Sequence, residues 1–362
     1  MAGARKWMGL LMVALSFSLA LVPLASASSE ASSGGQFSIG AVAPEVTSIT
    51  FYNANRSSTV TVAIPQNEYW IDVGISDANS IDDISNITVY LYYTTNSSSQ
   101  GTLPANVSPS DFVILKYVRT AYSGQPGTWA FYYSNGTKIG TSFGTWEIVN
   151  QSDPTDWGAT TGTFSVEIVV GKTAHEANDG IVAGDWEVQV NAVDNEGLSG
   201  SNSAYGYTVD WYGEIWVTTD FTFGTVKPGT LNNPINSTSS GHAGYLDVYV
   251  VSNGNYDINV KTNATWVGAD TKASLTVVNS TTTLGLKQIR IKINSTDNAT
   301  AAMVLSTSSY ENWLVDQTGP TEDGSASSGQ GAHHYAYLWL DVGTGVPVDS
   351  YTGEVYFQVI NA

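Results

Sequence analysis

Short runs in which hydrophobic and polar residues alternate dominate this sequence. The alternation is clearest in four runs, residues 69–76, 87–93, 186–193 and 288–293. In the last run, Ile289, Ile291 and Ile293 occupy every second position, and the positions between them are polar or basic. Successive side chains of a strand point to opposite faces, so a period of two with one polar face predicts half-buried antiparallel sheets.

Turn sequences separate several of these runs. Asn-Gly pairs stand at Asn135-Gly136 and Asn253-Gly254, and such pairs favour two-residue turns between antiparallel strands. We therefore expect a β-hairpin at each pair. Residues 300–315 are the one candidate for a short helix, although their β-branched and serine content disfavours it. The composition of residues 316–334 predicts a long surface loop.

The strand pattern divides near residues 207–220. The run WEVQVNAVDNEGLSG, residues 186–200, is similar to the last strands and turn of an immunoglobulin-like module, and a new set of strands follows it. We therefore predict an all-β fold of two tandem immunoglobulin-like β-sandwich domains, residues 37–210 and 211–362.

The N-terminus has the pattern of an export signal. Arg5 and Lys6 precede an apolar run at residues 8–23, and small residues follow at 25–27. The apolar run is shorter than the about 20 residues that a membrane span needs, so we predict a signal peptide at residues 1–27. An uncleaved anchor is the alternative. Residues 28–36 form a predicted flexible lead before the first domain.

Composition restricts the function further. The net charge is −19, which argues against a nucleic-acid partner because phosphate repulsion would dominate. Such a charge suits a soluble surface exposed to cations or salt. The absence of cysteine excludes disulfides, thiol catalysis and cysteine zinc sites, so the chain depends on its hydrophobic cores for stability.

Acceptor sequences for N-glycosylation are frequent. An exported chain with this many Asn-x-Ser/Thr sequences is predicted to carry a sugar-coated surface. The acceptors are Asn55, Asn86, Asn96, Asn106, Asn135, Asn150, Asn236, Asn263, Asn279, Asn294 and Asn298.

Several segments together resemble a family. The segments are PEVTSITF, DANSIDDISNITVYLYY, NAVDNEGLSG, FTFGTVKPGT, VVSNGNYDINV and DSYTGEVYFQVI. With the export signal, the dense acceptor sequences and the absent cysteines, the first three resemble secreted surface glycoproteins of archaea with immunoglobulin-like β-sandwich domains. The last three resemble the sandwich domains of prokaryotic envelope proteins. The resemblance implies a role in the envelope, in an S-layer or in extracellular filaments. It implies no catalytic residues.

Carboxylates indicate a candidate calcium site. Asp77, Asp82 and Asp83 lie in the run DANSIDDIS, and Asp194 and Glu196 lie in DNEG. Calcium takes six or more oxygen ligands, which loops between sandwich strands can supply. The alternative is turn chemistry, because Asp and Asn side chains satisfy nearby backbone groups in loops.

Other motifs for metal or nucleotide binding are incomplete. The run HEAND begins at His175 but lacks the second histidine of a zinc protease helix. The pair His333 and His334 is a candidate for a transition metal or for solvated side chains, and His242 stands alone. The glycines of FGTVKPGTL lack the lysine that follows the second glycine of a phosphate-binding loop, and Pro228 indicates a turn.

Aromatic and basic residues give three further expectations. Trp129, Trp146 and Trp157 are expected in the core, with sugar stacking as the alternative. Tyr90 and Tyr92 would form an exposed stripe or be buried against another module. The basic run Lys287, Arg290 and Lys292 is expected on the solvated face of a strand, paired with acids of a neighbouring strand or subunit.

These observations favour a non-catalytic structural or adhesive glycoprotein at the cell surface, secreted and with no membrane span after residue 27. The run QFSIGAV, residues 36–42, is a candidate for strand donation to a neighbouring subunit, which would make a filament or lattice. Its expected partners are copies of itself, other envelope proteins or glycans. The alternatives are a carbohydrate-binding module and an accessory protein of an extracellular hydrolase.

Overall fold

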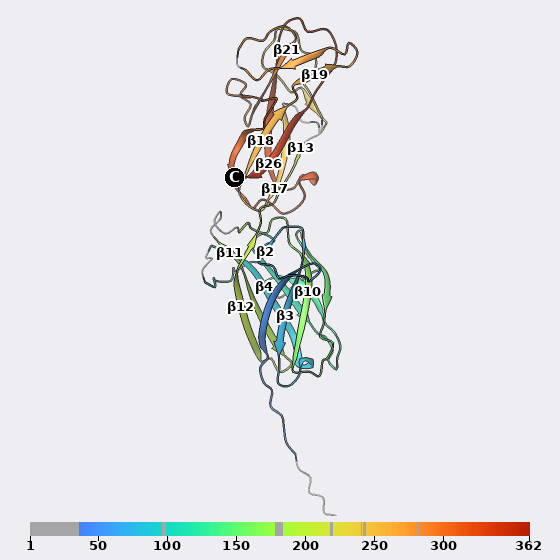
Figure 1. The fold of residues 1–362 in the computed structure, drawn as a ribbon, viewed down its shortest axis with the longest axis vertical. Coiled ribbons are helices and arrows are strands. Elements are labelled where there is room, and N and C mark those ends of the chain that lie inside the picture. The colour runs from blue at the N-terminus through green and yellow to red at the C-terminus, as the bar shows by residue number, and fades with distance from the viewer. Residues whose placement is uncertain are drawn as a thin grey trace, which may run out of the picture. The chain divides into compact units, whose positions relative to one another are not determined.

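The structure is a computed structural model that describes residues 36–95, 99–177, 184–217, 220–239, 241, 244–280 and 282–362. The predicted signal peptide, nearly all of the predicted lead, Asn96 and His242 lie outside these residues. Residues Ala41–Ala362 form one compact unit. The described part of the chain is built from strands and loops, with two 3-10 turns, η1 (Ile81–Asp83) and η2 (Ala326–Ser328). The all-β prediction is confirmed (Figure 1).

The first group of sheets spans residues 45–209. Its five-stranded sheet has the order β1 (Glu45–Asn53), β3 (Glu68–Ser76), β10 (Thr161–Val169), β9 (Trp146–Ser152) and β8 (Ser142–Phe143). Its seven-stranded sheet has the order β2 (Val62–Ala63), β12 (Ser199–Val209), β11 (Asp185–Asp194), β4 (Ile84–Thr94), β5 (Phe112–Val118), β6 (Thr128–Tyr132) and β7 (Lys138–Gly140). All neighbours pair antiparallel except β2 and β12, which pair parallel.

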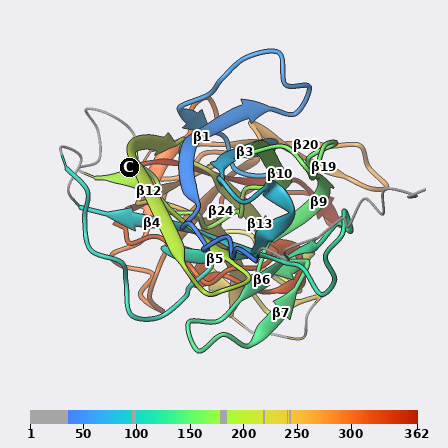
Figure 2. The ribbon, with the colours of Figure 1, turned by 90° about the horizontal axis from the view of Figure 1, so that it is seen from below.

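Alternating side chains from the two sheets form one core. Ile71 and Val73 of β3 and Val89 of β4 are buried in the same hydrophobic cluster. Val188 and Val190 of β11 join them. The alternating apolar residues that the sequence shows are therefore buried, as predicted, and β3 lies between β1 and β10 in its sheet (Figures 1 and 2).

The second group of sheets spans residues 213–361. The largest sheet has the path β13 (Gly213–Val217), β17 (Tyr245–Ser252), β24 (Ala332–Val342), β21 (Gln288–Asn294), β20 (Ser274–Val277), β19 (Thr265–Gly268) and β25 (Tyr351–Thr352). Off this path, β15 (Asn233–Pro234) pairs with β24 and β22 (Met303–Val304) pairs with β21. A three-stranded sheet contains β23 (Glu311–Gln317), β18 (Tyr256–Thr262) and β26 (Val355–Asn361), and β14 (Phe221–Thr222) pairs with β16 (Ser237–Thr238).

A second hydrophobic cluster fills this group. Ile289, Ile291 and Ile293 of β21 lie in it together with Ile258 and Val260 of β18. The predicted apolar face of residues 288–293 is therefore buried. The two clusters correspond to residues 46–209 and 223–342. The boundary at residue 210 stays a prediction, because residues 41–362 form a single compact unit.

One of the two expected hairpins forms. Strands β6 and β7 pair around Asn135-Gly136, and the backbone of Tyr133 pairs with Thr137. The connection therefore has three residues rather than the two that we predicted, with Gly136 in the left-handed region at φ 81°. A third loop residue in that region is the usual companion of a type I turn in such hairpins.

The prediction of a hairpin at Asn253-Gly254 is wrong. Strands β17 and β18 flank this pair but belong to different sheets. The Asn253 side chain is fully buried and holds a chain crossing instead. Its Nδ2 donates to the carbonyl oxygens of Ala174 and Asp210, each at 2.9 Å, and its Oδ1 accepts from the Tyr212 N–H at 2.7 Å. These bonds to distant segments determine the local conformation.

Two other expectations concern residues 300–334. Residues 300–315 form the strand β22 and the start of β23, so the candidate helix is wrong. The loop predicted at residues 316–334 is present as residues 318–331, between β23 and β24, and contains η2. This loop returns to the first group of sheets, where Asp323 accepts hydrogen bonds from the backbone and the hydroxyl of Thr145.

Candidate functional site

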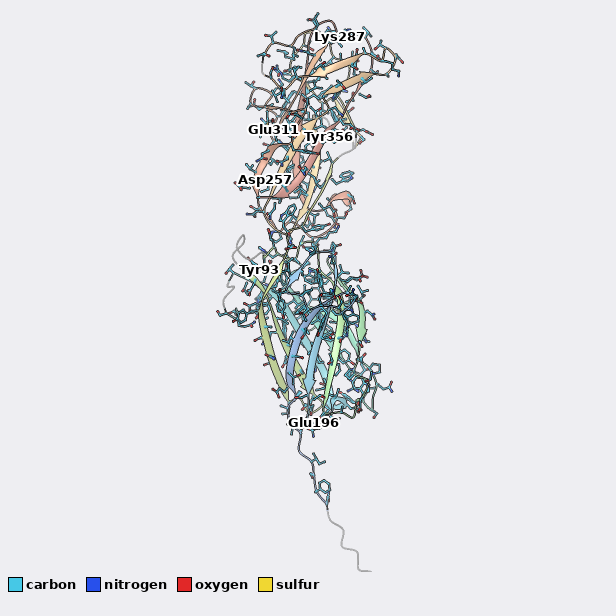
Figure 3. The ribbon with its side chains drawn as sticks, viewed as in Figure 1. Tyr93, Glu196, Asp257, Lys287, Glu311 and Tyr356 are labelled. Atoms are coloured by element: carbon cyan, nitrogen blue, oxygen red, sulfur yellow. The ribbon has the colours of Figure 1, made fainter. Side chains whose placement is uncertain are left out.

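Three carboxylates from separate elements meet at one end of the first group of sheets. Asp77 follows β3, Asp83 is in η1, and Asp194 is the last residue of β11. One oxygen of each lies within 4.8 Å of the others. Glu196, two residues after Asp194, marks this end of the strands in Figure 3. The structure therefore joins the two acidic runs that the sequence analysis considered separately.

Asp82 does not take part in this cluster. Its Oδ1 forms an ion pair with the Arg119 guanidinium at 2.7 Å and accepts from the Gly124 N–H at 2.8 Å. Its Oδ2 accepts from the Ser123 N–H at 2.9 Å. Burial raises the pKa of Asp82, but the hydrogen bonds from Gly124, Arg119 and Ser123 outweigh it, so its pKa is below the usual value. The predicted set Asp77, Asp82 and Asp83 thus divides between two neighbouring sites.

Asp77 is the most perturbed member of the cluster. Burial raises the pKa of its carboxyl, and the charges of Asp83 and Asp194 raise it further. A hydrogen bond from the Asn79 N–H lowers the pKa only in part. The pKa of Asp77 is therefore above its usual value, as expected for a buried acid beside like charges.

A groove lined by both apolar and polar residues lies in the second group of sheets. It has a volume of about 410 Å³ and is lined by Phe223, Trp266, Leu275, Val342 and Tyr351, among others. Tyr351 belongs to β25, which is the edge strand of the largest sheet. The groove therefore borders the edge strand β25 of that sheet. The sequence analysis missed it because its walls come from distant segments.

The N-terminal run QFSIGAV is exposed. The side chains of Phe37, Ile39 and Val42 are 85%, 78% and 50% accessible to solvent. The described residues before β1 have no regular secondary structure. The backbone N–H of Val42 donates to Asn79 Oδ1 at 2.7 Å, so the chain is held at the end of this run by the turn that follows Asp77.

Trp129, Trp146 and Trp157 do not form an exposed stacking platform. Trp129 and Trp146 are buried, as predicted. Trp157 is half-buried, with the Arg119 guanidinium 4.2 Å from its ring centroid. Tyr92 is buried with Phe112 under the chain's own loop residues Leu103 and Val107, and Tyr90 packs beside them. The expected exposed stripe or contact with another module is therefore wrong for Tyr92.

The basic run also differs from the expectation. Lys287 is exposed (Figure 3), but Arg290 and Lys292 are largely buried and both pair with Asp341 of β24. The Arg290 Nη2 lies 2.6 Å from Asp341 Oδ2, and the Lys292 Nζ lies 3.0 Å from Oδ1. The predicted pairing with an acid of a neighbouring strand is confirmed, whereas the predicted solvated face is wrong for these two residues.

The histidines have structural partners. The His334 Nε2 lies 2.8 Å from the Tyr256 hydroxyl, and burial lowers the pKa of His334. His333 is adjacent on β24 and pairs with Asp247 at 3.4 Å. Consecutive strand residues point to opposite faces, so the two rings do not converge on one metal. His175 stacks on Tyr93 with ring centroids 3.9 Å apart.

The predicted glycosylation acceptors differ in exposure. The exposed ones are Asn55, Asn106, Asn135, Asn150, Asn236, Asn279 and Asn298. The half-buried ones are Asn86, Asn263 and Asn294. Asn263 also uses its amide in the structure, where Nδ2 donates to the Tyr356 hydroxyl at 3.2 Å. An exposed amide is the form that a glycan requires, so the exposed group is the better set of candidates.

Comparison with known proteins gives little beyond these observations. No protein-family model matches the sequence, and no curated protein matches it significantly. The major pilin subunit BcpA of Bacillus cereus is 11% identical with a TM-score of 0.22, over 64% of this chain and 63% of the pilin. A DUF4466 family protein from Parabacteroides merdae is 10% identical with a TM-score of 0.22, over 83% of this chain and 99% of that protein. Similarities at these scores do not bear on function.

The prediction that no membrane span follows residue 27 can be compared only with the residues that the structure describes. Among them, no helix is long and apolar enough to cross a membrane. The predicted signal peptide at residues 1–27 lies outside these residues.

Proposed function

We infer that this chain is a non-catalytic structural subunit of an extracellular assembly, in which residues 36–42 of one copy add a strand to the second group of sheets of the next copy. The observation that carries the proposal is an exposed apolar segment on a chain that also has a groove with an apolar wall beside an edge strand. Strand addition uses this combination, with main-chain hydrogen bonds for affinity and pockets for alternate side chains.

The donor segment has the pattern that such a strand needs. In an extended chain, Phe37 and Ile39 point to the same face, and both side chains are exposed in the isolated copy. The segment from 36 to 42 carries no charged residue, so its burial does not require the desolvation of a side-chain charge. Burial in a neighbouring copy would remove from water the apolar side chains that the segment exposes in an isolated copy.

The acceptor groove has the matching properties. Phe223, Trp266 and Leu275 give it apolar walls, and β25 beside it is an edge strand. Full burial of a Phe or Ile side chain is worth about 1.5–3 kcal/mol. Two such side chains would together contribute about 3–6 kcal/mol to each contact between subunits, before the cost of ordering the segment.

Other features are consistent with a structural role. The ion pairs Arg119–Asp82 and Arg290–Asp341 each join separate segments of a sheet group. We propose glycans at the exposed acceptor sequences, which would leave a hydrated surface between contacts. The partner in this account is another copy of the chain, secreted to the cell surface.

Deletion of residues 28–42 tests the proposal. The mature protein is expected to assemble, and the deleted protein is expected to remain monomeric in sedimentation velocity and negative-stain microscopy. The double substitution of Phe37→Ser and Ile39→Ser is expected to weaken assembly about 100-fold or more, from the burial lost at two side chains.

A matched control separates this effect from general changes in solubility. Val149 is 45% exposed on β9, and Val149→Ser is expected to assemble like the unmodified chain. Assembly of the deleted protein to the same extent and with the same morphology would show that strand donation is wrong.

A further inference from the structure

The acidic cluster at the end of the first group of sheets leads to a second conclusion. We propose that Asp77, Asp83 and Asp194 bind one calcium ion, with Asp194 in place of the Asp82 that sequence proximity suggested. This proposal does not depend on strand donation, because each residue involved lies in the compact unit of residues 41–362.

Two buried carboxylate oxygens in the cluster lack hydrogen-bond partners. Asp77 and Asp194 are each 2% exposed. The Oδ1 of Asp77 accepts from the Asn79 N–H at 2.8 Å, and the Oδ1 of Asp194 accepts from the Leu198 N–H at 2.7 Å. The Oδ2 atoms of both are buried without a partner. Buried charges are normally paired or bound to a metal, so these two oxygens indicate a cation-binding site.

The protein itself does not neutralise the cluster. The charges that act on Asp77 are those of Asp83 and Asp194, and both are like charges. Asp83 Oδ1 accepts from the neutral Asn195 Nδ2 at 2.9 Å. Arg119 pairs instead with the neighbouring Asp82, 2.7 Å away. A divalent cation would replace repulsion among three carboxylates by attraction.

The dimensions and chemistry of the cluster favour calcium. Calcium binds oxygens at about 2.3–2.6 Å, so opposite ligands lie about 4.6–5.2 Å apart. The three carboxylate oxygens lie within 4.8 Å of one another. Zinc prefers nitrogen and sulfur ligands, and magnesium demands a smaller, near-octahedral shell. Water molecules would complete the about six to eight oxygens that calcium takes.

Binding would also steady the start of the folded chain. Asp77 begins the turn that contains Asn79, and Asn79 Oδ1 accepts the hydrogen bond from the Val42 N–H. A cation that fixes the Asp77 carboxylate therefore fixes the turn to which Val42 is bound. Slower hydrogen exchange of the Val42 amide is expected when calcium is present.

Isothermal titration of the EDTA-treated mature protein with calcium chloride tests the proposal. One site with a dissociation constant of about 0.1–1 mM is expected, the range of extracellular calcium modules. At 10 mM calcium, a constant of about 1 mM raises the ratio of folded to unfolded protein about 11-fold. Magnesium chloride is expected to bind more weakly, so its titration gives less heat at the same concentration.

Two variants distinguish the cluster from acidic surface in general. Asp194→Asn is expected to lose the calcium response and to be at least as stable as the unmodified chain in EDTA, because one repulsive charge is removed. Glu196→Gln is the matched control, since Glu196 is exposed in the same loop and lies outside the cluster, and it is expected to keep the response. Asp83→Asn, at a half-buried position, serves if Asp194→Asn does not fold.

Several results would overturn the calcium assignment. These are no binding up to 20 mM calcium, equal affinity for magnesium, and a full calcium response in both Asp194→Asn and Asp83→Asn. Loss of the response in Glu196→Gln would likewise assign it to the general surface charge. None of these results tests the assembly of the chain through residues 36–42, so each proposal can be refuted without the other.

Discussion

Replacement of Asp341 by asparagine should be among the most damaging single changes in the second group of sheets. The Asp341 side chain is fully buried, while those of Arg290 and Lys292 are 11% and 9% exposed. Asp341 also accepts from the Asn232 N–H at 2.6 Å, which attaches the segment before β15 to β24. The Asp341→Asn change removes the only charge that balances two cations at this position among the described residues.

The size of the effect follows from this burial. Breaking a buried ion pair by removing one partner costs about 3–5 kcal/mol, because the remaining charge is left without compensation. We therefore expect Asp341→Asn to lower the free energy of unfolding by about 3–5 kcal/mol. Urea unfolding followed by tryptophan fluorescence at pH 7 measures the change, and circular dichroism of the variant in buffer shows whether its strands remain.

The effect should depend on pH in a defined direction. Burial raises the pKa of Asp341, but hydrogen bonds from Asn232, Arg290 and Lys292 outweigh it, so the folded-state pKa is lowered. The carboxylate therefore stabilises the fold fully above its unfolded pKa of about 3.9, and this contribution is lost as the pH falls through the folded-state value. The difference between the unmodified chain and Asp341→Asn should be constant from pH 5 to 7 and shrink at lower pH.

A pair at the surface gives the matched control. Asp72 lies 3.2 Å from Arg56, and their side chains are 19% and 36% exposed. Asp72→Asn is expected to lower the free energy of unfolding by about 0–1 kcal/mol, as exposed pairs do. An Asp341→Asn loss below about 1 kcal/mol, no larger than that of the control, would refute the reasoning that burial makes the Asp341 network strong.

Three further predictions concern other parts of the structure. Asn253→Ala should lower the free energy of unfolding by about 2–4 kcal/mol in urea unfolding, because the buried Ala174 carbonyl and the half-buried backbone groups of Asp210 and Tyr212 lose their partner. A loss under about 1 kcal/mol would contradict this. Burial and the charge of Asp210 raise the pKa of Glu176, so its ionisation above that pKa destabilises the fold. Glu176→Gln should therefore be more stable than the unmodified chain at pH 7 but not at pH 4. Equal stability of the two proteins at both pH values would contradict this. Glycopeptide mass spectrometry should find higher occupancy at exposed Asn279 than at Asn263, whose amide is engaged, and the reverse order would count against the exposure argument.

Local pattern was sufficient for the strands and their buried faces. In β3 and β21, every second residue is apolar and buried, so the period of two identified both the element and its orientation. Arg290 and Lys292 show the limit of this reasoning. They alternate correctly with isoleucines, but Asp341 on the adjacent strand and the segment around Asn232 cover them, and coverage depends on residues far away in sequence.

The prediction of a hairpin at Asn253-Gly254 was wrong for a similar reason. The preference of this pair for a hairpin turn is local, whereas three hydrogen bonds to residues 174, 210 and 212 fix the buried Asn253 side chain. Tertiary contacts of this kind override local turn preference. No pattern within the run SNGN distinguishes the two outcomes.

The acidic cluster was predictable in part. The sequence indicated both acidic runs, but it could not show that Asp194 would lie beside Asp77. It also grouped Asp82 with Asp83 because they are adjacent. In the 3-10 turn η1, consecutive side chains are about 120° apart, so Asp83 faces the cluster while Asp82 faces Arg119. The turn sets the direction of each side chain, and the order of the residues does not reveal it.

A disulfide test between different copies addresses the central claim most directly, because the chain has no cysteine of its own. Chains with Phe37→Cys or Ile39→Cys are each mixed with chains carrying Val348→Cys, a fully exposed residue of the groove, and then oxidised. A disulfide requires Cα atoms about 4.4–6.8 Å apart, so strand donation predicts a cross-linked dimer in at least one mixture and none with Tyr133→Cys in place of Val348→Cys. Equal, background-level cross-linking in all mixtures would contradict the account.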